Sequence, residues 1–145
     1  MTKSDHKLYR VGRSRTGLGL FAVEPIKKGT VIILYIGRLL DCRKREDDAV
    51  NNKYLFELNG RWTIDGSVRE NIARYINHSC KPNAEADVKA RKHQVLICAR
   101  RNIKEGEEIS YDYGPEYFKL YLKPVGCKCI KCEMKRKKVT RKPLR

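Results

Sequence analysis

The sequence contains no hydrophobic run long enough to cross a membrane. Its longest apolar stretch extends from Val31 to Ile36, whereas a spanning helix needs roughly 20 apolar residues. A run this short between turn residues is typical of a buried β-strand. The first ten residues are polar and lack the apolar core of a secretory signal. The sequence therefore predicts no membrane partner and an intracellular location, in a bacterial cytoplasm or a eukaryotic nucleus.

Acidic residues are in short supply. The chain has 17 Asp and Glu against 33 Lys and Arg, which gives a formal net charge of +16. An excess of this size favours acidic partners such as nucleic acid or an acidic protein face. Seven of the basic residues lie in the final segment, Lys135 to Arg145, which holds no acidic residue. Such a tail serves either solubility or nucleic-acid binding.

The chain has six cysteines, and half of them are clustered. Three of the six cysteines fall close together, at Cys127, Cys129 and Cys132. Six cysteines would suffice for disulfides, but nothing else in the sequence points to export, where disulfides are common. Closely spaced thiols in an intracellular chain favour a metal site. We therefore interpret these three as metal ligands, with disulfides as the alternative.

Short apolar runs separated by turns dominate the rest of the chain, and helical patterns are scarce. We predict strands over Leu20–Ala22, Thr30–Tyr35, Tyr54–Leu58, Thr63–Asp65 and Gln94–Ala99. The Asn59-Gly60 pair predicts a hairpin between the third and fourth of these. Two short helices are expected, over Cys42–Val50 and Ser67–Ile76, the second with Ser67 as N-cap and Glu70 as its capping-box partner. The predicted fold class is mainly β with few short helices.

The most informative segment is the run from Arg74 to Asn83, which combines a charge, an aromatic ring, an amide, an imidazole and a thiol. A second dense segment, Glu107 to Gly114, follows about thirty residues later. Together they resemble the paired signature of SET-domain protein-lysine methyltransferases, RFxNHSCxPN followed by ELxYDYG. The order and spacing make the resemblance specific. It implies a fold of small sheets around a knot-like core in which the two segments cross.

The segment from Ser14 to Ala22 fits the same family. It contains Gly17 and Gly19, and the missing side chains of glycines let backbone approach a ligand closely. The segment resembles the GxGxF(A) motif that contacts S-adenosylmethionine. The resemblance implies that Gly17, Leu18 and Gly19 contact the cofactor and that Arg13 meets its carboxylate.

The resemblance also assigns aromatic and polar residues to a site. Leu34 to Arg38 is similar to EYxGE, with both acidic positions replaced, and implies that Tyr35 lines the channel for the target lysine. Tyr54 to Leu58 is similar to a YxFxL strand whose tyrosine touches the cofactor, although strands in general favour this alternation. The other implied cofactor contacts are Arg74, Tyr75, Asn77, His78 and Tyr113. Tyr113 is also the implied catalytic tyrosine, and Tyr111 holds the position that tunes the product.

Tetrahedral zinc takes four ligands, and the cysteine cluster supplies three. In the post-SET segment of this family the cysteine of NHSC completes the site, which implies Cys80 as the fourth ligand of one structural Zn²⁺. The cluster reads CxCx2C, two residues shorter than the usual CxCx4C. The implied organisation is a flexible N-terminus (1–8), a SET domain (9–114, with an inserted segment at about 41–53), a post-SET zinc lobe (115–133) and a basic disordered tail (134–145).

The function that the resemblance implies is methylation of a protein lysine ε-amine with S-adenosylmethionine as cofactor, mainly to the mono- and dimethyl states. The expected substrate is a histone or another basic protein, DNA-associated or ribosomal, and the tail adds a nucleic-acid contact. A zinc-stabilised nucleic-acid-binding module is the alternative that the charge supports, but it leaves Tyr111 to Tyr113 and the Asn77-His78 pair unexplained. An inactive SET domain that only binds partners is a third alternative. It is disfavoured because every core motif position is filled.

Overall fold

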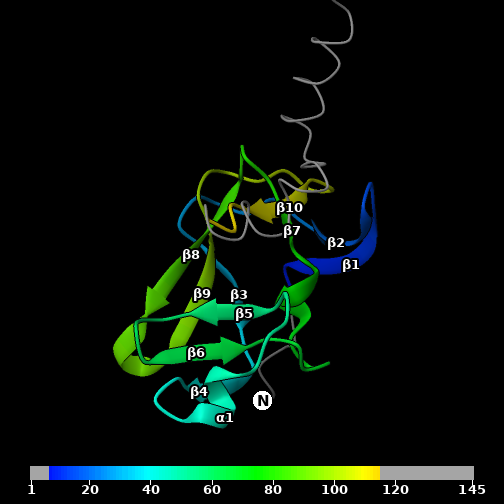
Figure 1. The fold of residues 1–145 in the computed structure, drawn as a ribbon. Helices are drawn as coiled ribbons and strands as arrows, with labels where there is room; N and C mark the ends of the chain where they lie inside the picture. Colours follow the sequence, from blue (N-terminus) through cyan, green and yellow to red (C-terminus); the bar gives the residue numbers. More distant parts are fainter. Residues whose placement is uncertain (1–6, 115–145) are drawn as a thin grey trace, which may run out of the picture.

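The computed structural model describes residues 7–114, which form three small sheets (Figure 1). The predicted zinc lobe and basic tail, and most of the predicted flexible N-terminus, lie outside the described residues. Within residues 7–114 no helix has the length and apolar character needed to span a membrane.

The first sheet has the strand order β1-β2-β10-β7 and lies in the upper part of Figure 1. β1 (Tyr9–Ser14) and β2 (Gly17–Ala22) form an antiparallel hairpin, and β10 (Glu108–Tyr111) continues the sheet on the other side of β2. The two-residue strand β7 (Asn77–His78) then pairs with β10 in parallel. Strands from the beginning, middle and end of the described chain therefore meet in this sheet.

The other two sheets have three strands each and are antiparallel throughout. One has the order β3-β9-β8, from Val31–Tyr35, Gln94–Ala99 and Ala84–Lys89. The other has the order β4-β6-β5, from Arg38–Asp41, Trp62–Asp65 and Leu55–Glu57. The single α-helix of the described residues, α1 (Arg45–Asp48), is one turn on the β4 side. Two 3₁₀ turns, Ile72–Tyr75 and Ala90–Lys92, complete the elements.

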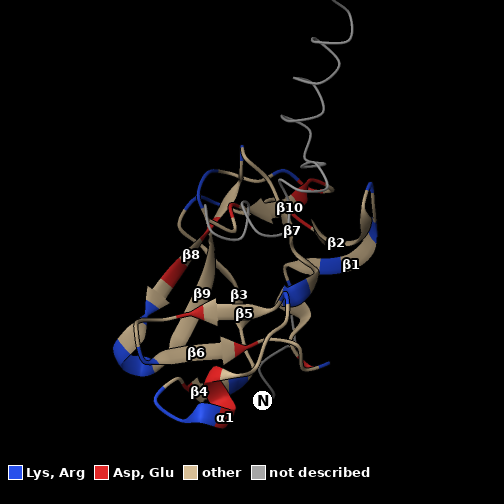
Figure 2. Ribbon diagram, viewed as in Figure 1, with Lys and Arg blue, Asp and Glu red and all other residues tan. Residues whose placement is uncertain are grey.

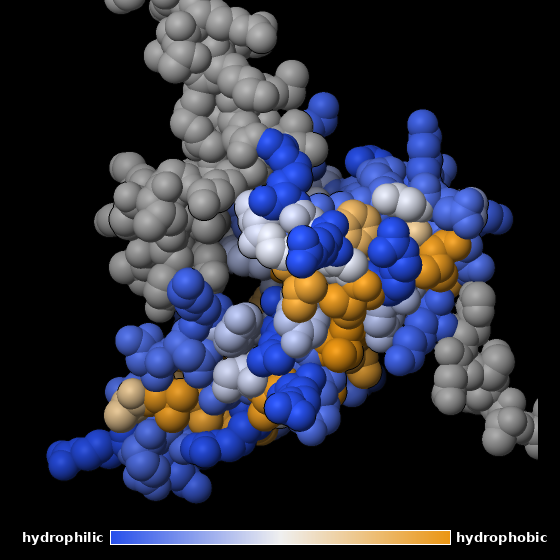
Figure 3. Space-filling view, turned by 90° about the vertical axis from the view of Figure 1, so that its right-hand side faces the viewer, coloured by the Kyte–Doolittle hydropathy of each residue, from blue (hydrophilic) through white to orange (hydrophobic). Residues whose placement is uncertain are grey.

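One apolar core joins the sheets. Leu20, Ile97 and Ile109 are buried completely and come from β2, β9 and β10. Alternation along these strands turns one face of each sheet inward. Figure 3 shows that apolar side chains reach one face of the surface in narrow patches between hydrophilic ones. The core therefore holds the sheets together without a large helix.

The five predicted strands are confirmed as β2, β3, β5, β6 and β9, with ends shifted by at most a few residues. The hairpin predicted at Asn59-Gly60 joins β5 to β6, and the Asn59 side chain accepts the backbone N–H groups of Arg61 and Trp62. The helix predicted over Cys42–Val50 exists as the single turn of α1. The sequence analysis did not predict strands at β1, β4, β7, β8 and β10.

The helix predicted over Ser67–Ile76 is wrong. Only Ile72–Tyr75 is helical, as a 3₁₀ turn, and no side chain caps it. Ser67 instead donates its backbone N–H to the Asp65 carboxylate, and Asn71 uses its side chain on residues outside the segment. These tertiary bonds hold the backbone in turns and override the local capping signal.

Candidate active site

The two motif segments found in the sequence lie side by side. β7 and β10 pair Asn77 with Ser110 and His78 with Tyr111. Beyond the strands, the buried Asn83 fastens the segments further, because its side chain accepts the Ser110 N–H (2.9 Å) and donates to the Glu108 carbonyl (2.8 Å). Backbone pairing and one buried amide thus bring distant parts of the sequence to one place.

An aromatic cavity of about 50 Å³ opens beside this junction. Its walls include Tyr35 from β3, Phe56 from β5, and Tyr111 and Tyr113 at the end of β10. The rings pack in pairs, with centroids 5.3 Å apart for Tyr35 and Phe56 and 4.9 Å apart for Tyr111 and Tyr113. Lys53, Tyr54, Leu55 and Arg74 complete the lining. The structure therefore brings the three predicted channel tyrosines together around one narrow space.

Specific hydrogen bonds fix the orientation of these tyrosines. The Tyr35 hydroxyl donates to the Tyr54 carbonyl at 2.7 Å, and the Tyr113 hydroxyl donates to the Ile76 carbonyl. Gly66 packs directly on the Tyr35 ring, because a Cβ at this position would lie 2.5 Å from the tyrosine hydroxyl. The cavity wall is therefore set by main-chain acceptors and by a residue without a side chain.

The glycine segment lies against Asn77. The Asn77 side chain donates to the Leu18 carbonyl (3.0 Å) and to the Glu108 carboxylate (2.8 Å), which the Ser14 hydroxyl also reaches at 3.0 Å. A Cβ at Gly19 would lie 2.6 Å from the same carboxylate. Leu18 and Gly19 thus lie in one polar cluster with Asn77. Gly17 pairs with Ser14, and Arg13 is exposed opposite Leu18, in the β1–β2 ladder.

Three further predicted residues form a stacked group. The Arg74 guanidinium lies over the Tyr75 ring at 4.8 Å and over the Tyr54 ring at 5.8 Å. Two of its nitrogens donate to the Tyr75 hydroxyl and the Ser67 carbonyl. Its Nε is buried and has no hydrogen-bond partner within residues 7–114. Buried polar atoms are normally satisfied, so this N–H points to a missing acceptor beside the cavity.

His78 connects β7 to the tyrosine end of the site. Its Nδ1 accepts the backbone N–H of Tyr113 at 3.1 Å, so the proton of the neutral ring is on Nε2, which lies 3.2 Å from the Cys80 sulfur. Burial lowers the pKa of His78 from its ordinary value of 6.5, against a smaller opposing effect of Asp112. The ring is therefore neutral at pH 7 and acts as an acceptor toward Tyr113.

Comparison with known proteins identifies the arrangement. The chain matches the SET domain family over residues 17–114. It belongs to this family. Among similar proteins are the Drosophila melanogaster histone-lysine N-methyltransferase trr, 39% identical over 67% of this chain, and the Caenorhabditis elegans histone-lysine N-methyltransferase set-2, 40% identical over 74%. A Schizosaccharomyces pombe histone-lysine N-methyltransferase, H3 lysine-4 specific, is 37% identical over 77%. The matched part covers 4%, 8% and 13% of these three relatives, respectively.

The predicted zinc site of this SET domain lies mostly outside the described residues. Cys127, Cys129 and Cys132 all lie beyond residue 114. Cys80 is half-buried and follows directly on the β7 segment, with its sulfur beside His78. Within residues 7–114 no group of three or more metal-ligating side chains occurs. The four-cysteine site therefore stays a prediction.

Several residues of the SET domain that shape the site were not singled out from the sequence. Phe56 lines the cavity, while Asn71, Asn83 and Glu108 anchor its walls. Asn71 is fully buried, accepts the Ile36 N–H (3.1 Å) and donates to the Gly66 carbonyl (2.9 Å), and so holds the backbone on both sides of Tyr35. The asparagines close to the motifs were the one sequence signal for these anchors. Their role could not be predicted, because a buried amide needs hydrogen-bond partners and only the fold shows which groups these are.

Proposed function

We propose that this SET domain transfers a methyl group from S-adenosylmethionine to a lysine ε-amine of a protein substrate. The observation that carries the proposal is the aromatic cavity of Tyr35, Phe56, Tyr111 and Tyr113 beside the Asn77-His78 strand. A narrow aromatic slot accommodates a lysine side chain and its cationic end. The relatives are named as histone-lysine methyltransferases, which supports the same chemistry here.

The residues around the cavity fit the cofactor. The unsatisfied Arg74 Nε offers a donor, and the Tyr54 and Tyr75 rings beside it offer apolar faces. The backbone of Gly17 to Gly19, held by Asn77, offers close approach on the other side. We assign these residues, with Arg13, His78 and Tyr113, to cofactor binding. When bound, S-adenosylmethionine supplies the methyl group, as the sulfur–carbon bond breaks and the nitrogen–carbon bond forms.

The lysine nitrogen must be neutral to attack, whereas a free lysine has a pKa of about 10.4. Among the described residues that line the cavity, Lys53 and Arg74 are cationic and none is acidic. Positive neighbours and an apolar aromatic wall both disfavour the ammonium form, so they lower the amine pKa. The proton leaves to solvent along the open side of the cavity, and no protein base is required.

Positioning is then the main task of the protein. Tyr35 and Tyr113 are fixed by their bonds to the Tyr54 and Ile76 carbonyls, so their rings keep the amine on one line of approach. Holding reactants at attack distance can supply on the order of 7 kcal/mol or more. We assign the catalytic orientation to Tyr113, with Tyr35 as the channel wall.

We further propose that the products are mainly mono- and dimethyl-lysine. Tyr111 is 6% exposed and its ring packs at a tilt against that of Tyr113, so its ring and hydroxyl limit the space beside the amine. A hydrogen bond from the Tyr111 hydroxyl to the amine, or to a water beside it, is worth on the order of 1 kcal/mol. Room for further methyl groups requires losing this bond, and that cost biases the product toward lower methylation without forbidding trimethyl-lysine.

We infer that the substrate is a histone or another basic protein and that the enzyme works at chromatin. The named substrates of the relatives support this assignment. The acidic positions of the channel motif are Leu34 and Arg38 here, and Arg38 is held by Asp47 at 2.8 Å. Attraction for a basic substrate therefore has to come from elsewhere in the chain.

We propose one structural Zn²⁺ held by Cys80, Cys127, Cys129 and Cys132, since four thiolates suit tetrahedral zinc. Cys80 already lies at the site, next to His78. Purified protein should carry one zinc per chain, and Cys80→Ser should lower this stoichiometry. Cys42→Ser is the matched control, because its sulfur contacts the Thr63 hydroxyl away from the site. Full zinc content in Cys80→Ser would rule out this ligand set.

The decisive experiment for the function is isotopic methyl transfer from labelled S-adenosylmethionine to a histone H3 peptide and to a panel of basic proteins. Wild type should label lysine. Tyr113→Phe should lower turnover by up to about 100-fold, as expected when an orienting group is lost, whereas Tyr9→Phe on β1 should not change it. Absence of transfer to every protein in the panel, or equal turnover in the two variants, would overturn the proposal.

A further inference from the structure

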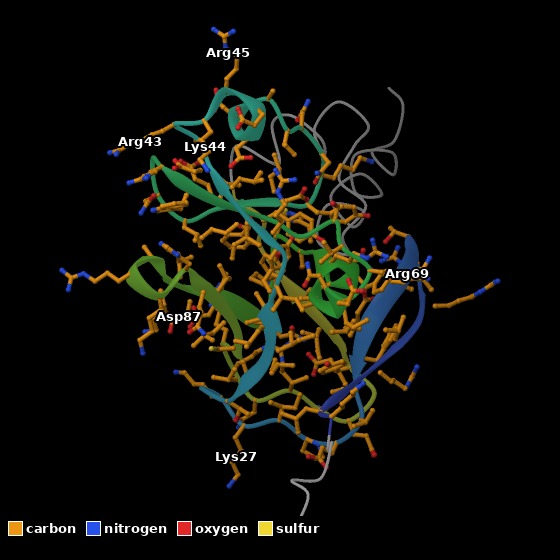
Figure 4. All side chains as sticks on the ribbon, turned by 90° about the horizontal axis from the view of Figure 1, so that it is seen from below. Lys27, Arg43, Lys44, Arg45, Arg69 and Asp87 are labelled. Atoms are coloured by element: carbon orange, nitrogen blue, oxygen red, sulfur yellow. The ribbon has the colours of Figure 1, made fainter. Side chains whose placement is uncertain are left out.

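The described domain carries a basic edge that the proposed methyl transfer does not use. We define this basic edge as Arg43, Lys44, Arg45, Arg91 and Lys92, all of which are exposed. Figure 4 shows Arg43 and Arg45 projecting away from the body of the protein, with Lys44 between them on the same connection. Figure 2 shows Lys and Arg gathered both at the β4–α1 connection and at the β8–β9 turn, along one side of the molecule. None of the five lines the aromatic cavity.

Contacts between the strands hold the two halves of the basic edge in place. On one side, the Asp41 carboxylate accepts the Arg43 N–H and two bonds from the Arg61 guanidinium, at 3.1 and 3.0 Å. Next to Arg61, the Trp62 ring packs on the His93 ring with centroids 4.9 Å apart. His93 ends the 3₁₀ turn that contains Arg91 and Lys92. The β4–α1 connection and the β8–β9 turn therefore belong to one preformed surface.

The charges of the basic edge are compensated only in part, by the longer-range attraction of Lys44 to Asp41 and Asp47. None of its five residues forms an ion pair in the described part of the chain, whereas the adjacent cations Arg38, Arg61 and Lys89 are neutralised by Asp47, Asp41 and Asp87. The exposed acids in the same segment are Glu46 and Asp48 on α1, which leave the balance positive. Clustered like charges repel one another, and a polyanion relieves that repulsion.

We propose that the basic edge binds the phosphate backbone of duplex nucleic acid. Phosphate contacts need exposed cations and no apolar anchor, whereas a protein interface is centred on buried aromatic or aliphatic anchors. All five residues of the basic edge are Lys or Arg, and the one large hydrophobic residue exposed beside the β8–β9 turn is Val88. The one tryptophan of the chain, Trp62, lies between the two halves of the basic edge and is half-buried, with the Arg61 guanidinium over its ring at 4.5 Å and the His93 ring packed against it. The surface therefore suits a phosphate backbone better than an acidic protein, and it binds separately from the lysine channel.

The salt dependence of binding gives the expected size of the effect. Each phosphate neutralised on B-form DNA adds about 0.9 to the slope of log K against log salt concentration. Removing four of the five cations should therefore reduce the slope by up to about 3.6. The tail Lys135–Arg145 contributes its own share, which stays constant as long as the tail is kept.

The test uses the full chain and a labelled 20-base-pair DNA duplex, with affinity measured by fluorescence anisotropy at several salt concentrations. The edge variant carries Arg43→Gln, Lys44→Gln, Arg91→Gln and Lys92→Gln. The control variant carries Lys27→Gln, Lys28→Gln, Arg69→Gln and Lys104→Gln, which removes the same charge from exposed positions outside the basic edge. Both variants should methylate a short peptide like wild type, provided that the proposed function holds.

The edge variant should lose at least about ten-fold in affinity and about two or more units of salt slope, and the control variant clearly less. Equal losses in the two variants would overturn the proposal, because net charge alone would then explain binding. Selective loss of binding to polyglutamate, with DNA affinity unchanged, would assign the basic edge to an acidic protein and also overturn it. These outcomes do not depend on methyl transfer.

Discussion

Replacing Asn71 with alanine should weaken both the fold and the lysine channel. This side chain is fully buried and joins two backbone groups, the Ile36 N–H at 3.1 Å and the Gly66 carbonyl at 2.9 Å. Ile36 follows Tyr35, and Gly66 packs on the Tyr35 ring. One amide therefore sets the position of a cavity wall from both sides.

The magnitude follows from what alanine leaves behind. The Gly66 carbonyl lies in a buried environment and would lose its Asn71 partner, which costs about 1–3 kcal/mol. Ile36 is 42% exposed, so water can partly replace the bond to its N–H, and this loss is nearer 1 kcal/mol. We expect Asn71→Ala to lower the free energy of unfolding by about 2–4 kcal/mol. A loosened Tyr35 should also reduce turnover more than it raises the KM for the peptide.

The assay is urea unfolding followed by circular dichroism, with peptide methylation measured where the variant is still folded. Asn102→Ala is the matched control, because the Asn102 side chain also accepts one backbone N–H, that of Lys28 at 2.9 Å, but at an exposed site. The control should lose less than about 1 kcal/mol. If Asn71→Ala lost no more stability than the control, the buried clamp would not have the role assigned to it.

Three further predictions test other parts of the site. Tyr111→Phe should shift the mass spectrum of a peptide product toward di- and trimethyl-lysine, and an unchanged product distribution would remove Tyr111 from product control. Gly19→Ala should weaken binding of S-adenosylhomocysteine in calorimetry because its Cβ would lie 2.6 Å from the Glu108 carboxylate, whereas Gly60→Ala, with nothing within 4 Å, should bind normally. Burial alone would raise the pKa of Glu107, but hydrogen bonds to its carboxylate outweigh it and lower that pKa from its ordinary value of 4.5. This stabilising contribution is complete above about pH 4.5 and is lost as the pH falls through the folded-state pKa. Glu107→Gln should therefore make the melting temperature fall less steeply as the pH is lowered below about 4.5. The same fall in melting temperature as in wild type would contradict this.

The sequence by itself determined the family and predicted several residues that the fold brings together around the aromatic cavity. The Arg74–Asn83 and Glu107–Gly114 runs carry side-chain types whose order is specific, so Asn77 and Tyr113 could be predicted as site residues without coordinates, and the Leu34–Arg38 segment did the same for Tyr35. Strands with strong alternation, such as Gln94–Ala99, were also predictable, because burial of one face leaves a period of two in the sequence. The turn at Asn59-Gly60 was also predictable, because this residue pair by itself favours a tight hairpin turn.

Only the tertiary structure decided how these pieces are held. Ser14 and Glu108 are 94 positions apart yet share a hydrogen bond, and no local pattern encodes such a pairing. Asn71 lies where the sequence favoured a helix, but its amide binds Ile36 and Gly66 instead. The basic edge likewise exists because β4, β6 and the β8–β9 turn bring separate segments together. Local sequence fixes propensities of a few residues, whereas buried polar partners and surface charge clusters depend on contacts between distant parts of the chain.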